Sequence, residues 1–218
     1  MPGPDAAPGA AALRHRDQTA FAAAAVCAVA AALIWWLWVA PIVQSVAAAD
    51  SRPLGEAVTV ELAAGEHAGV WARGIAANLG TVECRATGPG GGALAMRTGP
   101  SLDWDDTLWW MTPKPGFVQV LRFTADDAGS YAVSCRDSLE TYDAEVLVAG
   151  DAFGSGVLGL GAGGASRFPI GSVLAFGAVV LPAVAVLIPV VILLRRAGTR
   201  VRERRRRTAS EAAFRTRC

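Results

Sequence analysis

Cysteine offers the most easily placed chemistry in this chain, and its four copies fall into two groups. Cys27 lies within a long apolar segment and Cys218 is the last residue, so neither has a natural partner. Cys84 and Cys135 lie in the middle of the chain, where an even pair in an oxidising compartment predicts a disulfide. Closing a loop of about 50 residues would stabilise the fold by about 3–4 kcal/mol. The alternative is a pair of reduced core cysteines.

A stretch of tryptophans and aspartates is the best candidate for contact with a ligand or partner. Indole rings beside carboxylates suit sugar faces, peptides and cationic groups, because they combine stacking with cation–π attraction. The alternative is that Trp109 or Trp110 fills the core while Trp104 lies against a bilayer. The candidate contact residues are Trp104, Asp105, Asp106, Trp109 and Trp110.

The sequence carries no set of residues typical of an enzyme. His67 is the only histidine in the middle of the chain, and the serines there lack the G-x-S-x-G context of a nucleophile. Cys84 and Cys135 lack the C-x-x-C spacing of zinc and redox sites. Aspartates at 103, 105 and 106 lack the spaced ligands and terminal bidentate glutamate of a calcium loop. We therefore predict no catalysis, no cofactor and no metal.

Two long uncharged segments must position these residues. Ala20–Val43 has 24 residues without a charge, and Val173–Leu194 has 22. A helix of that length rises about 33 Å, which is enough to cross a bilayer core of roughly 30 Å. Both segments are therefore predicted to span a membrane.

Charge predicts which way the spans run. Residues 44–171 carry a net charge of −7 and residues 195–218 a net charge of +8. Arginines are costly to move across a bilayer, so both tails are predicted in the cytoplasm and the middle of the chain outside. No aromatic platform or folded motif accompanies these arginines, so we predict binding to anionic lipid headgroups and not to nucleic acid. The predicted headgroup residues are Arg195, Arg196, Arg200, Arg202, Arg204, Arg205, Arg206 and Arg207.

The first span is either removed by signal peptidase or kept as a membrane anchor. The A-x-A sequence Ala47–Ala49 before Asp50 is typical of a signal peptidase site. The apolar run before it, however, is much longer than the usual 7–15 residues of a signal peptide core. We therefore expect an uncleaved anchor, with Trp35, Trp36 and Trp38 near the outer membrane interface.

The exported middle has the pattern of an all-β domain. Short alternating runs are separated by glycine- and proline-rich turns, with almost no helical period. This pattern predicts an antiparallel sandwich. The expected strands are Ala57–Leu62, His67–Ala72, Thr81–Ala86 and the runs ALAMRT, FVQVLRF, SYAVSCR and AEVLVA.

One local pattern resembles a known family. Asp127, Gly129, Tyr131 and Cys135 resemble the D-x-G-x-Y-x-C tyrosine corner of immunoglobulin-like sandwiches, although tyrosine and cysteine are four residues apart here instead of two. The run from Leu62–Glu66 onward is also similar to the bacterial pre-peptidase C-terminal type of sandwich. Either resemblance implies an accessory or binding module. Arginine greatly outnumbers lysine, and the whole layout is similar to actinobacterial two-span membrane proteins with small β-sandwich ectodomains.

The predicted fold class is thus a membrane protein in which two transmembrane helices flank an antiparallel β-sandwich. Its expected role is non-catalytic binding or scaffolding at the cell envelope through a protein or glycan, and the alternative is an accessory subunit of a transport or signalling assembly. Small residues along both spans also allow a homo-oligomer or intramolecular helix packing. The predicted segments are a disordered cytoplasmic tail (1–19), a first span (20–43), the sandwich (44–149), a glycine-rich linker (150–171), a second span (172–194) and an arginine-rich cytoplasmic tail (195–218).

Overall fold

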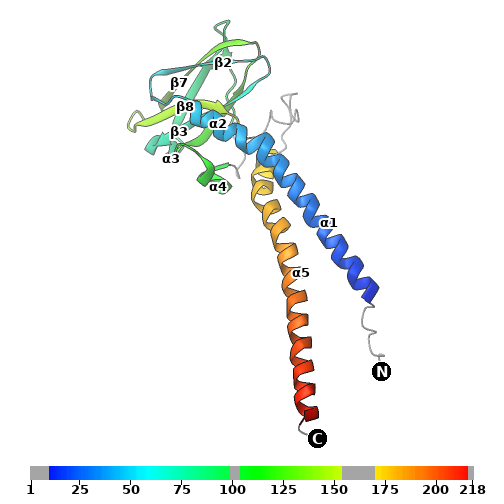
Figure 1. Ribbon diagram of the computed structural model, residues 1–218. Helices are drawn as coiled ribbons and strands as arrows, with labels where there is room; N and C mark the ends of the chain where they lie inside the picture. Colours follow the sequence, from blue (N-terminus) through cyan, green and yellow to red (C-terminus); the bar gives the residue numbers. More distant parts are fainter. Residues whose placement is uncertain (1–9, 99–103, 154–169, 216–218) are drawn as a thin grey trace, which may run out of the picture. The chain divides into compact units, whose positions relative to one another are not determined.

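The computed structural model describes residues 10–98, 104–153 and 170–215 (Figure 1). The chain divides into two compact units, of which one comprises Ala32–Val179 and the other comprises Met1–Ala31 together with Val180–Cys218. All described strands belong to the unit from Ala32 to Val179. This unit also holds the tryptophan-rich stretch, whereas the arginine-rich segment belongs to the other unit.

Three helical segments follow one another without a break at the start of the chain: α1 (Ala10–Ile34), the π-helical η1 (Trp35–Val39) and α2 (Ala40–Ala48). Proline at position 41 explains the change of helix type, because its ring lacks an N–H and crowds the carbonyl four residues earlier. A wider turn before it relieves the crowding, and the Ala40 N–H bonds to the Trp35 carbonyl. The helix extends beyond both ends of the predicted span and ends at Ala48. The described part of the tail that was predicted to be disordered, from Ala10 onward, is helical.

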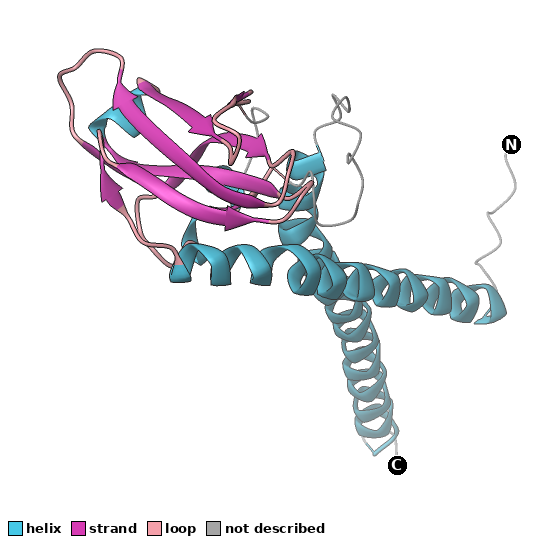
Figure 2. Cartoon of the chain, turned by 90° about the horizontal axis from the view of Figure 1, so that it is seen from above, coloured by secondary structure: helices cyan, strands magenta, loops and turns pink. Residues whose placement is uncertain are grey.

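Two four-stranded antiparallel sheets follow, and Figure 2 shows them as two groups of strands. The first sheet has the order β1 (Arg52–Pro53), β8 (Ala144–Gly150), β3 (His67–Gly74) and β6 (Val118–Thr124). The second has the order β2 (Ala57–Leu62), β7 (Gly129–Asp137), β4 (Val82–Thr87) and β5 (Ala93–Leu94). The predicted strands therefore form, except that ALAMRT pairs only at Ala93–Leu94 and through a bridge between Arg97 and Arg122.

One hydrophobic cluster takes side chains from both sheets. Val70, Phe123 and Val146 come from the first sheet, and Tyr131 and Val133 come from the second. On β7 every second residue is buried, as the period of two predicts for a strand with one face in a core. Burial of these aliphatic and aromatic side chains drives the sheets together.

The first sheet is buried on its other face as well. Residues 68–72 of β3 are all buried, and they alternate between the core that both sheets share and a second hydrophobic cluster. In that second cluster Trp71 and Leu147 meet Trp38, Ile42 and Val46 from the helical segment before the sheets. A strand that is covered on both faces has buried residues at successive positions, and β3 shows this pattern. The helix α2 runs along the sheet that it covers (Figure 2).

Four further helices complete the described chain, and one of them is long. By length and composition, two apolar helical stretches, residues 15–48 and 171–199, are able to cross a membrane. The second lies inside α5, which continues past the predicted span through the arginine-rich tail. The four helices are α3 (Ile75–Leu79), α4 (Trp104–Thr107), η2 (Trp109–Met111) and α5 (Ile170–Arg215). Residues 154–169, most of the predicted glycine-rich linker, lie outside the described residues.

The turn between β7 and β8 is organised by a nearly buried carboxylate. Asp137 Oδ2 accepts hydrogen bonds from the backbone N–H groups of Thr141 and Tyr142, each at 2.9 Å. Hydrogen bonding from the Thr81 side chain, followed by these backbone N–H groups, lowers the pKa of Asp137 from 3.8 to about 2. Glu140 in this turn has φ of 52°, a left-handed conformation that this network holds in place.

This carboxylate makes the fold sensitive to acid in a defined range. The folded state holds its proton less tightly than the unfolded state, so Asp137 stabilises the fold above pH 4 and loses that effect between about pH 4 and pH 2. We expect Asp137→Asn to be less stable at neutral pH and to show a flatter acid transition, measured by urea unfolding at each pH. The exposed neighbour Asp143→Asn is the control and should keep the steep fall. An unchanged acid transition in Asp137→Asn would contradict this account.

Candidate functional site

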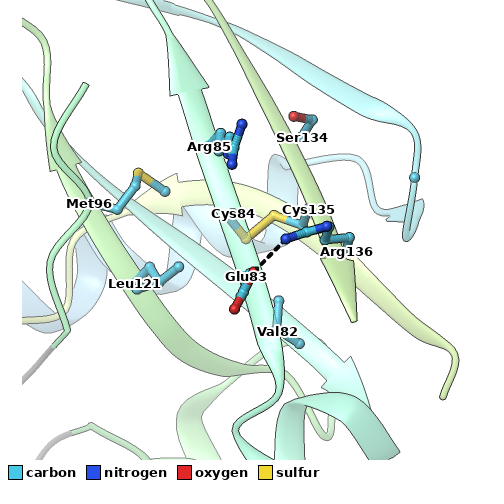
Figure 3. A pocket seen from close by; sticks show the side chains of 10 residues that line it. Val82, Glu83, Cys84, Arg85, Met96, Leu121, Ser134, Cys135 and Arg136 are labelled. Atoms are coloured by element: carbon cyan, nitrogen blue, oxygen red, sulfur yellow. Dashed lines mark hydrogen bonds and ion pairs between the residues drawn. A yellow bond between two sulfur atoms is a disulfide. The ribbon is translucent and has the colours of Figure 1, made fainter. Parts of the chain in front are cut away.

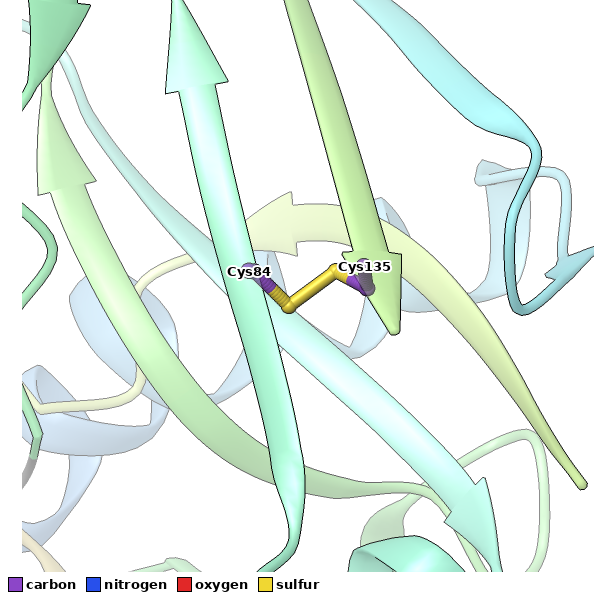
Figure 4. The surroundings of a disulfide bond; sticks show 2 residues. All are labelled: Cys84 and Cys135. Carbon is purple, nitrogen blue, oxygen red and sulfur yellow. A yellow bond between two sulfur atoms is a disulfide. The ribbon is translucent and has the colours of Figure 1, made fainter. Parts of the chain in front are cut away.

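Cys84 on β4 and Cys135 on β7 form the predicted disulfide (Figure 4). The two residues are direct partners in neighbouring strands of one sheet, and both contribute to the core that the sheets share. The disulfide of immunoglobulin-like sandwiches instead joins the two sheets. The disulfide arrangement of that family is therefore not reproduced here.

A pocket of about 580 Å³ opens beside this disulfide (Figure 3). Met96 and Leu121 give it apolar lining on one side, and the charged side chains of Glu83, Arg85 and Arg136 also line it. Arg136 Nη2 lies 3.0 Å from Glu83 Oε2, but both side chains are more than half exposed, so this ion pair adds little stability. The lining has no histidine, and among the described residues no group of three potential metal ligands occurs. The pocket gives no support for acid–base or metal chemistry.

Tyr131 has the hydrogen bonds expected of a tyrosine corner. Its hydroxyl donates to the Asp127 carbonyl at 2.6 Å and accepts from the Asp127 N–H at 3.2 Å. The ring is buried and lies 6.1 Å from that of Phe123, between the centroids. The side chain thereby fixes the turn that leads into β7, which is a structural role.

The predicted contact residues separate into two environments. Trp104 is only 1% exposed, whereas Trp109 is 68% and Trp110 is 53% exposed. This is the reverse of the alternative in which Trp109 or Trp110 fills the core, and it removes Trp104 from any exposed contact surface. Asp105 Oδ2 accepts a hydrogen bond from the Gln119 N–H at 3.2 Å, so that carboxylate holds α4 against β6. Asp103 lies outside the described residues.

We call residues Trp104–Lys114 the tryptophan strap and residues Trp35–Ala48 the outer helix, because the first lies along the second. The Trp104 ring is edge-on to that of Trp38, with 5.5 Å between centroids, and the Trp110 ring is 5.9 Å from that of Trp35. At the other end, the Lys114 ammonium donates to the Ala49 carbonyl. The C-terminal end of a helix carries a partial negative charge, so the helix dipole also stabilises a cation at this position.

Trp104 connects the strap to the sheet as well as to the outer helix. Its ring is 6.2 Å from that of Trp71 on β3, and its Nε1 donates to the Thr112 hydroxyl at 2.9 Å. A buried indole N–H usually has a hydrogen-bond partner, and for Trp104 the strap itself supplies one in Thr112. The outer helix, the strap and the first sheet therefore meet at a single side chain.

Two polar side chains that the sequence did not single out, Ser45 and Gln119, hold the end of β8 in place. Ser45 on the outer helix accepts from the Gly150 N–H at 2.9 Å and donates to the Ile42 carbonyl at 2.9 Å. The buried Gln119 donates to Asp151 Oδ1 at 2.9 Å and accepts from the Ala152 N–H at 2.7 Å. In the sequence, Ser45 and Gln119 are distinguished only as polar residues within apolar runs, and this does not reveal which groups they bind.

The beginning of α5 packs into the same cluster as the outer helix. Ala175 and Ala178 are buried there, and the Trp35 Nε1 donates to the Ala178 carbonyl at 2.9 Å. A Cβ on Gly171 would come within 2.6 Å of the Phe153 carbonyl oxygen, so only glycine fits. These three small residues serve packing within the Ala32–Val179 unit.

In the other unit, an ion pair joins α1 to α5. Arg196 Nη2 lies 2.5 Å from Asp17 Oδ2, and its guanidinium is 5.9 Å from the centre of the Phe21 ring. Arg195 and Arg196 are exposed, and the helix continues through the other predicted headgroup arginines, whose side chains lie outside the described residues. One of the eight predicted lipid-binding arginines thus has a protein carboxylate as its partner.

No protein-family model matches this chain, and no curated protein or solved structure matches it.

The two environments of the strap give a matched pair of variants. Trp104→Ala should lower the free energy of unfolding by about 3–5 kcal/mol, because it leaves a cavity between the outer helix and the sheet. Trp109→Ala removes an exposed ring of the same type and should change that energy in solution by no more than about 0.5 kcal/mol. Urea unfolding of the full chain in detergent, followed by circular dichroism, measures both. Equal effects of the two variants would show that Trp104 does not join the layers.

Proposed function

We propose that this chain is a non-catalytic integral membrane protein of the cell envelope. In this proposal two helices cross the membrane, both termini lie in the cytoplasm, and the paired sheets form a disulfide-bonded β-sandwich outside. The sandwich serves as a scaffold or as a binding module for an envelope protein or glycan. The outer helix carries the proposal, because it continues an apolar helix and supplies Trp38, Ile42 and Val46 to the core of the strand-containing unit.

The exposed surface of the two long helices supports membrane insertion. From Ala20 to Leu37 the first helix has 18 residues without a charge, which corresponds to a rise of about 27 Å. Large apolar side chains are exposed along it, including Val26, Val29 and Leu33, and α5 exposes a similar series. Hydrocarbon is the solvent that suits such a surface, since monomeric soluble proteins rarely expose large contiguous apolar patches.

Charge and cysteine chemistry support the orientation. The segment that carries the disulfide has a net charge of −7, and the segment after the second helix has a net charge of +8. Arginine-rich segments are retained in the cytoplasm, which leaves the strand-containing unit outside. Disulfides persist in that oxidising compartment, so the Cys84–Cys135 bond fits the same orientation.

The packing of the outer helix argues against cleavage after Ala49. Cleavage there would remove the helix that covers Trp71, Trp104 and Leu147, together with the carbonyl that Lys114 binds. Three large apolar side chains would then be exposed to water on the outer face of the first sheet. We infer that the mature protein keeps its first span and that residues 47–49 serve as the end of a packed helix.

Labelling in intact cells tests this topology. With a membrane-impermeant maleimide, we expect Cys84 and Cys135 to react only after reduction, and Cys218 to react only after the cells are opened. The mature chain should begin near Met1. A chain that begins at Asp50, or labelling of Cys218 in intact cells, would overturn the two-span proposal.

Affinity purification in mild detergent then tests the role. The binding proposal predicts that the full chain is recovered without a stoichiometric membrane partner and that it captures an envelope protein or glycan. Recovery with a membrane partner in equal amount, and without that capture, would contradict the proposal and favour an accessory subunit.

A further inference from the structure

Two tryptophans of the strap, Trp109 and Trp110, are more than half exposed. Trp109 and Trp110 lie in the 3-10 helix η2, and their exposed fractions of 68% and 53% are large for the most apolar aromatic type. The Trp110 N–H donates to the Thr107 carbonyl within the strap at 3.2 Å. Neither ring belongs to a hydrophobic cluster among the described residues, so something outside the described chain must cover them if they are to be shielded from water.

One of these rings lies beside the first apolar helix, within the strand-containing unit. Trp110 lies 5.9 Å from Trp35, centroid to centroid, and Trp35 donates its N–H to the Ala178 carbonyl on α5. Trp36, next along the outer helix, is 78% exposed. Trp35 thus links the strap, through Trp110, to the beginning of α5, through the Ala178 carbonyl.

We propose that η2 inserts Trp109 and Trp110 into the headgroup region of the outer leaflet, where they form a third membrane contact beside the two spans. This inference rests on the proposed function, because it needs both helices to be in the bilayer. Indoles are most stable at the membrane interface, where the ring is shielded and the N–H is hydrated. The contact of Trp110 with Trp35, on the helix that this proposal places in the bilayer, favours lipid as the occupant over a protein or a glycan.

The charges around the rings specify the kind of lipid contact. Asp105 and Asp106 precede η2, and no arginine or lysine lies within the strap before Lys114, whose ammonium is bound to the Ala49 carbonyl. Attraction to anionic headgroups is therefore not the driving force. Burial of the indoles predicts insertion into neutral phosphatidylcholine, with little dependence on salt.

Spin labels on the full chain in phosphatidylcholine nanodiscs test the inference. Three single-cysteine variants are made in a background with Cys27→Ala and Cys218→Ser, since the disulfide cysteines do not react while oxidised. Trp109→Cys reports on η2, and Val29→Cys on the first span. Leu139→Cys is the matched control, because Leu139 is 57% exposed in the β7–β8 turn. The measurement is the collision rate of each label with oxygen, which dissolves in lipid, and with a water-soluble nickel complex.

The inference predicts that the label at 109 has a several-fold lower nickel collision rate than the label at 139, while the label at 29 reports the bilayer interior. If the label at 29 is in lipid and those at 109 and 139 are equally exposed to nickel, the inference is wrong and the proposed topology stands. In that case the rings are free for a protein or a glycan. A label at 29 that is exposed to nickel would overturn both.

A second measurement keeps the native cysteines and replaces no residue with a label. Phosphatidylcholine brominated near the headgroup quenches tryptophan fluorescence by contact. Relative to the native chain, Trp109→Phe with Trp110→Phe should lose a large part of that quenching, and the loss should be the same at low and high salt. Quenching that is unchanged in the double variant would contradict insertion of η2.

Discussion

The structure depends on one constraint, which is that the first sheet must be covered on both faces. Its inner face meets the second sheet, and its outer face presents Trp71 and Leu147, which water would solvate poorly. The chain meets this requirement with residues at the end of its own apolar helix, Trp38, Ile42 and Val46. A segment that composition assigns to a membrane span is therefore also part of the folded domain, and the two roles cannot be separated by cutting the chain.

The same constraint explains why tryptophans occur where they do. Trp38 and Trp104 are buried between layers, whereas Trp36 and Trp109 are exposed, although each exposed ring lies within five residues of a buried one. The π-helical turn at Trp35–Val39 lies where the helix begins to pack against the sheet. Function in this account comes from surfaces that the fold leaves uncovered, and the disulfide and the tyrosine corner stabilise the unit that carries them.

Period and composition were sufficient to predict the strands, the two apolar helices and the disulfide, because these depend on local patterns. The strap was harder, since seven residues separate Thr112 from Trp104 and only the fold shows which ring is buried. The helix continues past Val43, the predicted end of the span, to Ala48, and its last turns pack against the sheet. Composition does not show this packing, because apolar residues look alike in sequence whatever they pack against. The partners of Ser45 and Gln119 depend on contacts between distant segments, which no single-chain pattern encodes.

Hydrogen exchange on the full chain in nanodiscs tests most directly whether the outer helix belongs to the domain. The account predicts that amides of α2 exchange as slowly as those of β3 and β8, and that Trp104→Ala accelerates all three segments together. Cooperative loss of protection would mean that helix, strap and sheet unfold as one unit. If α2 instead exchanged rapidly while β3 and β8 stayed protected, the helix would be an attachment to the domain and the central claim would fail.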